Sequence, residues 1–161
     1  MAKVGIVMGS PSDVEVMKNV QTTLTELGIE SEFRILSAHR TPKEVCEWAS
    51  TAEERGLEVL VCAAGMAAHL AGVVAAHTRL PVLGVPLAGG VMDGLDSLLS
   101  TLQMPKGTPV ATFAVGKAGA INAAIFAAKI MSKADKSLLD RLDALKAKQV
   151  AQMKEADAQH S

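Results

Sequence analysis

The alternation of short apolar segments with amphipathic ones constrains the fold of this chain more than any other feature. Between the apolar segments, apolar residues recur at spacings of three and four, as at Met17, Val20, Leu24 and Leu27, which indicates the buried face of a helix. Strands that alternate with helices build a parallel sheet with helices on both faces. The segments that we expect to be buried strands are 4–8, 30–36, 58–63, 81–85 and 109–114.

This pattern predicts an α/β protein, a three-layer α/β/α sandwich of the flavodoxin-like or Rossmann-like kind with a parallel five-stranded sheet. Residues 1–161 suit a single domain with a sizeable core. An extra C-terminal helix is predicted at about 135–156, where Leu138, Leu142, Leu145 and Met153 form an apolar stripe among many charges. We expect this stripe to pack on a neighbouring subunit, and packing within one subunit is the alternative.

Composition and charge exclude several classes of protein. Lys and Arg number 16 and Asp and Glu 17, so no excess of positive charge favours nucleic acid as a partner. The long apolar stretch 59–76 is interrupted by Gly65, His69 and Gly72, which indicates a strand, a turn and a helix rather than a membrane span. The N-terminal residues do not resemble a signal peptide, so we predict a cytoplasmic protein with neither membrane nor nucleic acid as partner.

Three polar or glycine-containing loops follow the first three predicted strands. They are 9–13, 37–41 and 64–69. A parallel sheet gathers the loops at the carboxyl ends of its strands into one crevice, where ligands of α/β proteins bind. We therefore expect the chemistry of this chain to lie there.

The first of these loops has the character of an anion site. Ser10 and Ser12 add hydroxyl donors to the free N–H groups of a helix start, and Asp13 can accept hydrogen bonds from ribose hydroxyls. The alternative is that Ser12 or Asp13 merely caps the helix. The loop is neither a Walker loop nor a GxGxxG motif, so dinucleotide binding has little support.

The second loop places an anion clamp beside a proton-transfer group. Arg40 can bind a phosphate with two parallel hydrogen bonds, and His39 can move a proton near neutral pH. A structural role for His39 is the alternative. Thr41 and Pro42 indicate the start of the following helix, which we expect to run to about Arg55.

The third loop offers backbone N–H groups for a carboxylate or another anion. Within it, His69 either contacts the ligand or caps the turn. His, Cys, Asp and Glu are nowhere spaced as metal ligands, so we predict no metal site.

These loops, in their order and spacing, resemble the class I members of the PurE family over roughly residues 3–145. The resemblance rests on the motifs Met8–Asp13, Ser37–Pro42, Gly65–Leu70, Pro81–Pro86, Gln103–Pro105, Gly116–Ala120 and Asn122–Ala124. It implies a flavodoxin-like fold, a homo-octamer, and neither a metal nor an organic cofactor. It also implies an N5-carboxyaminoimidazole ribonucleotide mutase activity on a small-molecule ribonucleotide.

Roles for single residues follow from the resemblance. His39 matches the histidine that moves a proton between the ring carbon and the departing nitrogen. The remaining residues are expected to bind the substrate, its nucleotide part on the first two loops and the migrating carboxylate on the third: Gly9, Ser10, Ser12, Asp13, Ser37 and Arg40, and then Gly65, Ala67, His69 and Leu70.

Two residues depart from the family pattern. Met66 stands where class I members usually have a second glycine, and Ala71 where they usually have proline. Met66 therefore adds a side chain beside the expected carboxylate seat.

Two alternatives to the mutase are open. A direct CO2-dependent aminoimidazole ribonucleotide carboxylase usually has Lys at the position of Arg40 and lacks the run 67–70, so both features favour the mutase. A non-catalytic nucleotide- or flavin-binding module is compatible with the fold. The scarcity of aromatic residues, with three Phe, one Trp and no Tyr, disfavours flavin.

Overall fold

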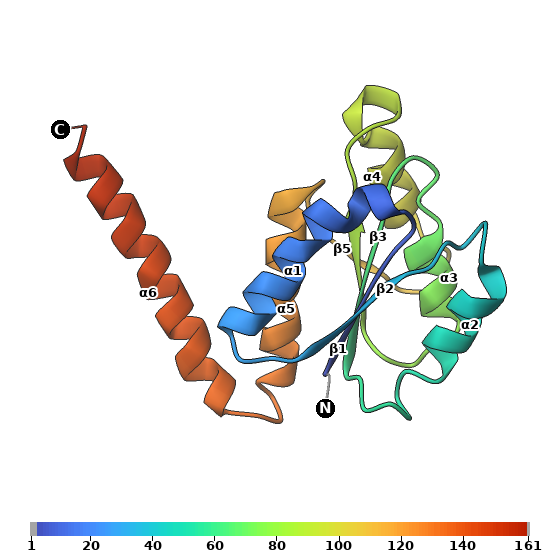
Figure 1. Cartoon of the computed structure of the whole chain (residues 1–161), viewed down its shortest axis with the longest axis horizontal. Coiled ribbons are helices and arrows are strands. Elements are labelled where there is room, and N and C mark those ends of the chain that lie inside the picture. The colour runs from blue at the N-terminus through green and yellow to red at the C-terminus, as the bar shows by residue number, and fades with distance from the viewer. Residues whose placement is uncertain (1–2, 161) are drawn as a thin grey trace.

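The computed structural model describes residues 3–160, and within them five parallel strands form one sheet (Figure 1). The strands are β1 (Val4–Met8), β2 (Ser31–Ile35), β3 (Val59–Ala64), β4 (Val82–Pro86) and β5 (Ala111–Thr112). Their order across the sheet is β2-β1-β3-β4-β5, which is the flavodoxin-like order. The predicted fold class is confirmed.

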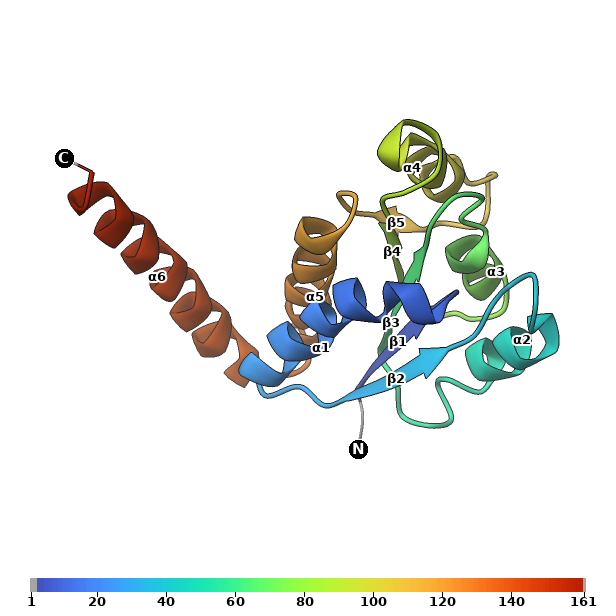
Figure 2. The ribbon, with the colours of Figure 1, turned by 45° about the horizontal axis from the view of Figure 1, so that its top comes forward.

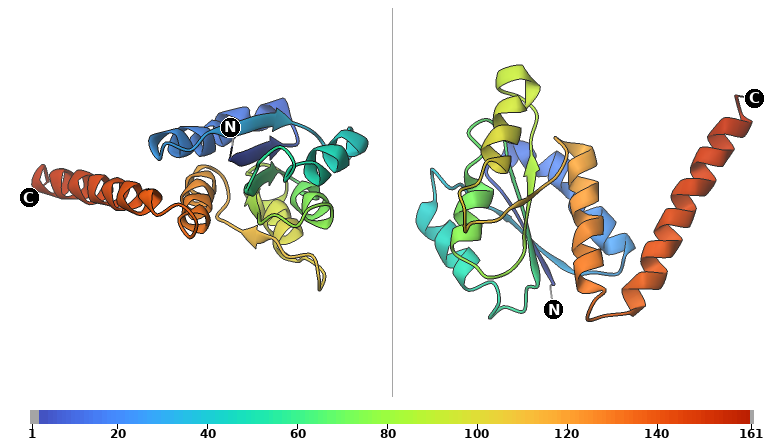
Figure 3. Two further views of the ribbon diagram at one scale, coloured as in Figure 1. Left: turned by 90° about the horizontal axis from the view of Figure 1, so that it is seen from below. Right: turned by 180° about the vertical axis from the view of Figure 1, so that it is seen from behind.

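Helices cover both faces of the sheet. Helices α1 (Val14–Glu26) and α5 (Lys117–Met131) lie on one face. Helices α2 (Pro42–Ser50), α3 (Leu70–Ala76) and α4 (Leu95–Leu102) lie on the other (Figure 3). Successive side chains of the central strands point to opposite faces of the sheet. They therefore contribute to two separate hydrophobic cores, one on each face.

Helix α2 is held tightly against the sheet by its tryptophan. A Cβ on Gly5 of β1 would lie 2.8 Å from Trp48 Cζ2, so the ring needs a glycine beneath it. The indole Nε1–H donates to Glu32 Oε1 at 2.5 Å, and the guanidinium of Arg55 lies 5.8 Å from the ring centre. These contacts hold the last turns of α2 against the sheet.

Several element boundaries differ from the prediction. Helix α2 ends at Ser50 rather than near Arg55, because the Thr51 hydroxyl donates to Glu47 O and Arg55 Nη2 donates to Trp48 O, which satisfies carbonyls of the last turn. Helix α3, expected within the apolar stretch 59–76, begins at Leu70. Strand β5 spans only Ala111–Thr112 within the predicted 109–114, and it pairs with β4 alone at one edge of the sheet.

Helix α6 (Ser137–Ala158) leaves the body of the domain (Figure 2). Its first turns are attached: Leu138 is buried in the core beside α1 and α5, and Arg141 Nη1 donates to Leu27 O at 2.9 Å. Farther along, Val150 and Met153 are exposed. Packing of this helix on a neighbouring subunit stays a prediction. Despite its length, neither α6 nor any other helix within residues 3–160 is apolar enough to cross a membrane.

Candidate active site

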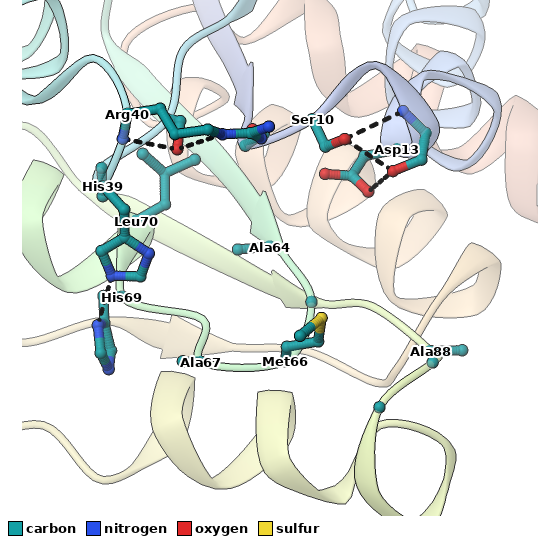
Figure 4. Close-up of a pocket in the computed structure, with 17 residues that line it drawn as sticks. Ser10, Asp13, His39, Arg40, Ala64, Met66, Ala67, His69, Leu70 and Ala88 are labelled. Carbon is teal, nitrogen blue, oxygen red and sulfur yellow. Dashed lines mark hydrogen bonds between the residues drawn. The ribbon is translucent and has the colours of Figure 1, made fainter.

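A cavity of about 490 Å³ lies at the carboxyl edge of the sheet (Figure 4). Its size suits a small organic ligand. The structure places around it every residue that the sequence predicted for the site: Gly9, Ser10, Ser12, Asp13, Ser37, His39, Arg40, Gly65, Ala67, His69 and Leu70. The roles of these residues stay predictions.

The first loop is organised by serine hydroxyls. Ser10 precedes a 3-10 turn, η1 (Pro11–Asp13), and its Oγ accepts from the Ser12 amide at 3.4 Å and from the Ser12 hydroxyl at 2.9 Å. Ser12 Oγ also lies 3.1 Å from Asp13 Oδ1. The Asp13 side chain makes no capping hydrogen bond to α1, so its carboxylate is available to the cavity.

Asp13 is partly withdrawn from solvent. Burial raises the pKa of its carboxyl above the ordinary value, while the Ser12 hydroxyl, the Ser10 backbone and the charge of Arg40 act in the opposite direction. Burial is the largest of these effects. The site therefore holds this carboxylate at an energetic cost to the fold.

Arg40 joins the second loop to the first. Its Nη2 donates to Gly9 O at 2.6 Å, and its backbone N–H and Nε both reach Ser37 Oγ, at 3.2 and 3.4 Å. Thr41 precedes α2 but does not cap it with its side chain, because its Oγ1 instead accepts from the Ser37 amide at 2.8 Å and closes the turn. Contacts within the chain thus orient the guanidinium along the cavity wall.

His39 and His69 form a hydrogen-bonded pair. His39 Nε2 and His69 Nδ1 are 2.8 Å apart, and the two rings are nearly perpendicular, at 89°. The His69 side chain makes no capping hydrogen bond to α3, so the capping role that the sequence left open for it is not observed. Figure 4 shows the imidazole of His39 at the edge of the cavity, between Arg40 and His69. The pair is therefore placed to exchange a proton with a ligand in the cavity.

The far side of the cavity includes residues that the sequence did not single out. Ala88, Gly89 and Gly90 follow β4, and the two glycines have φ values of 97° and 75°, which favour glycine. Met66 has a φ of 56° and is 64% exposed. Ala88–Gly90 could have been found from their place after β4. This strand lies beside β3, and the loops that follow neighbouring parallel strands lie at the same edge of the sheet.

Residues 3–160 contain no group of three or more His, Cys, Asp or Glu side chains that could hold a metal ion. The polar groups that the cavity offers are instead hydroxyls, one guanidinium, one carboxylate and the histidine pair. Such a set suits an anionic ligand that carries hydroxyls and exchanges a proton.

The fold and the cavity together define a flavodoxin-like α/β protein with a small-molecule site at the carboxyl edge of its sheet. The family model for AIR carboxylase matches residues 3–152, so the chain belongs to this family.

Curated relatives and a solved structure agree with this assignment. The chain is 53% identical over 140 residues to the N5-carboxyaminoimidazole ribonucleotide mutase of Bacillus subtilis, covering 87% of this chain and 86% of the relative. It is 54% identical over 132 residues to the protein of the same name from Pyrococcus abyssi, covering 82% and 75%. The crystal structure of Treponema denticola PurE matches with a TM-score of 0.86 at 28% identity, covering 99% of this chain and 98% of that one.

Proposed function

We propose that this protein is an N5-carboxyaminoimidazole ribonucleotide mutase of de novo purine biosynthesis. The observation that carries the proposal is that one cavity joins a prepared anion clamp, Arg40, to a hydrogen-bonded pair of imidazoles, His39 and His69. Two relatives more than half identical to this chain carry the name of this activity. The substrate is then a small ribonucleotide.

The reaction is an isomerisation in which a carboxylate changes its atom of attachment. The bond between the exocyclic nitrogen and the carboxyl carbon breaks, the electron pair stays on nitrogen, and CO2 is held beside the ring. Ring carbon 4 then attacks CO2 and loses its proton, while the nitrogen gains one. His39 carries this proton from carbon to nitrogen, and the cavity holds CO2 near its acceptor.

Each side of the cavity has a part in this scheme. Arg40 and Ser10 hold the phosphate, and Asp13 accepts from the ribose hydroxyls, with Ser12 and Ser37 supporting them. The loop 65–70 then holds the migrating carboxylate on the side of the cavity where His69 meets His39.

The direct carboxylase is the second candidate, because the matching family model is described as AIR carboxylase. One assay separates the two. The purified protein is offered N5-carboxyaminoimidazole ribonucleotide, and separately aminoimidazole ribonucleotide with bicarbonate, and formation of the C4-carboxylated product is followed. Turnover of the first substrate alone at low bicarbonate supports the mutase. Turnover that depends on bicarbonate would replace it by the carboxylase.

A homo-octamer and a cytoplasmic location belong to the same proposal. Apolar side chains exposed on α4 and α6 support association of subunits. They are Leu95, Leu99, Leu102, Leu139, Val150 and Met153. Light scattering of the purified protein measures the mass of the assembly, and a monomeric mass would contradict this part of the proposal.

A further inference from the structure

We propose that Ser100, a residue of α4 outside the cavity lining, is a positioning residue that holds the loop 65–69 and thereby keeps His69 paired with His39. The inference rests on the proposed function for its kinetic test. Its structural basis is separate, because it depends on contacts within the chain.

The first observation is the hydrogen bond between α4 and this loop. Ser100 Oγ accepts from the Ala68 amide at 3.0 Å. This amide has no other acceptor among residues 3–160. A buried N–H that loses its partner costs about 1–3 kcal/mol. The hydrogen bond therefore favours the observed position of the loop.

The second observation is how the hydroxyl of Ser100 is oriented. It has one proton to give, and the nearest carbonyl is Asp96 O, at 2.7 Å in the preceding turn of α4. The carbonyls of Ser97 and Met66 are more distant, both at 3.3 Å. Donation to Asp96 O leaves a lone pair of the oxygen directed at the Ala68 amide. The hydroxyl is therefore fixed by the helix and in turn fixes the loop.

The third observation is the placement of His69 directly after this anchor. The side chains on either side of it, Ala68 and Leu70, are 1% and 2% exposed, so the chain is held before and after the histidine. The His69 amide donates to Ala67 O at 2.9 Å, which adds a tight turn. The imidazole is the exposed group of a segment whose backbone is anchored.

The fourth observation is that the loop requires such an anchor. Met66 adopts a left-handed φ of 56°, a conformation that persists only where the surroundings enforce it. The histidine pair has little tolerance, because a heavy-atom separation that grows from 2.8 Å to about 3.6 Å is no longer a hydrogen bond. Release of the Ala68 amide would therefore disturb the pair without removing any group that touches the substrate.

The test compares four variants with the wild-type protein in steady-state kinetics. Ser100→Ala removes the acceptor, and Ser100→Thr keeps it, since a threonine hydroxyl can make the same bond to the preceding turn. Ser100→Cys keeps the size with a weaker acceptor and replaces Ser100→Ala should that variant fail to fold. Thr101→Val is the matched control, because Thr101 Oγ1 donates within α4 to Ser97 O and does not contact the loop.

We expect Ser100→Ala to lower kcat about tenfold or more while KM changes little, as for a catalytic group displaced by a fraction of an ångström. Ser100→Thr should restore most of the rate, and Thr101→Val should match the wild type. Hydrogen exchange at the Ala68 amide should quicken in Ser100→Ala and not in Thr101→Val. An unchanged kcat or an unchanged exchange rate at Ala68 in Ser100→Ala would overturn the inference. A wild-type protein that turns over neither substrate would refute the proposed function, while the exchange measurement still decides on Ser100.

Discussion

The two sides of the cavity acquire their shape by different means. On the side formed by 9–13 and 37–41, side chains link the loops through hydrogen bonds, and no residue in these two ranges has a positive φ. On the side formed by 65–69 and 88–90, and in the turn 91–94 that follows it, the backbone itself is left-handed at several positions. Those positions are Met66, Gly89, Gly90, Met92, Asp93 and Gly94.

The second side is held from behind by acceptors on polar side chains. Asp93 Oδ1 accepts from the Gly89 amide at 3.1 Å, and Asp96 Oδ2 accepts from the Val91 amide at 3.0 Å. Because of this difference, we expect substitutions on the two sides to affect different properties of the protein. Removing one side chain from the first side should cost function, whereas changing backbone freedom on the second side should alter stability.

His39→Asn should have the largest effect and should act on function alone. We expect kcat to fall by about 10² to 10⁴, the range for loss of a general acid/base, with little change in substrate affinity. His77→Asn is the control, because His77 lies outside the cavity, where its Nδ1 contacts Val73 O. Near-normal turnover by His39→Asn would remove this residue from the mechanism.

Gly94→Ala tests the second side. Gly94 has a φ of 111°, and a Cβ there would lie 2.9 Å from Val115 Cγ1 and 3.2 Å from Leu87 O. We expect the free energy of unfolding in urea to fall by about 2–4 kcal/mol from strain and overlap combined. Gly107→Ala, at a φ of 99° with open space around it, should lose about 1–2 kcal/mol from strain alone. Equal losses would show that the overlap is relieved at no cost.

Arg40→Ala returns to the first side. Loss of charged hydrogen bonds to the substrate phosphate should cost about 1.5–3 kcal/mol, which raises Kd by roughly 10- to 150-fold in calorimetric titrations. Arg34→Ala carries the same change of charge at a position outside the cavity lining and should leave Kd unaltered. If both variants bind alike, Arg40 does not hold the phosphate.

Met66→Gly should have a smaller effect, with the opposite sign to Gly94→Ala. Glycine adopts the left-handed conformation of this position without strain, which stabilises the fold. The greater conformational entropy of glycine in the unfolded chain offsets part of this gain, so we expect a net rise of about 0.5–1 kcal/mol in the free energy of unfolding. The same replacement at Met153, in the exposed part of α6, should lower it by about 1 kcal/mol. A loss of stability in Met66→Gly would mean that the side chain makes contacts that outweigh the strain.

Asp13→Asn should have the smallest effect on stability. Since burial raises the pKa of the folded carboxyl, the folded protein binds a proton more readily than the unfolded chain, and the ionised form lowers stability above that pKa. The amide should therefore raise Tm slightly at pH 7, and the difference should vanish as acid protonates Asp13. Calorimetry at pH 7 and at about pH 3, which is below the ordinary pKa of an aspartic acid, measures both, and a lower Tm of the variant at pH 7 would contradict the burial argument.

The sheet could be predicted from the sequence because local patterns encode it. Apolar runs such as Val4–Met8 and Val59–Ala64 are buried on both faces, and their helices carry the matching stripes. The end of α2 could not be predicted, because it depends on where the side chains of Thr51 and Arg55 find acceptors. The short length of β5, which spans Ala111–Thr112, was likewise not predicted.

The cavity was predictable to the extent that its residues are polar or belong to a recognisable motif. Ser10, Asp13, His39 and Arg40 indicate chemistry by their side chains. Ala88–Gly90 contribute backbone shape, and small residues give no chemical signal of that. Ser100 was missed for another reason, since its bond to Ala68 spans 32 residues and arises only when α4 packs behind the loop.

The single hydrogen bond between His39 and His69 makes the two imidazoles one unit with two proton arrangements. If His39 Nε2 carries the proton and donates it, His39 Nδ1 is bare and is a base toward the cavity. If His69 Nδ1 donates instead, a neutral His39 carries its proton on Nδ1 and is an acid there. When His39 Nδ1 takes a proton from the cavity and the Nε2 proton passes along the 2.8 Å contact to His69, the same side chain changes from acceptor to donor, and the reverse transfer returns the proton, as an isomerisation without net proton release requires.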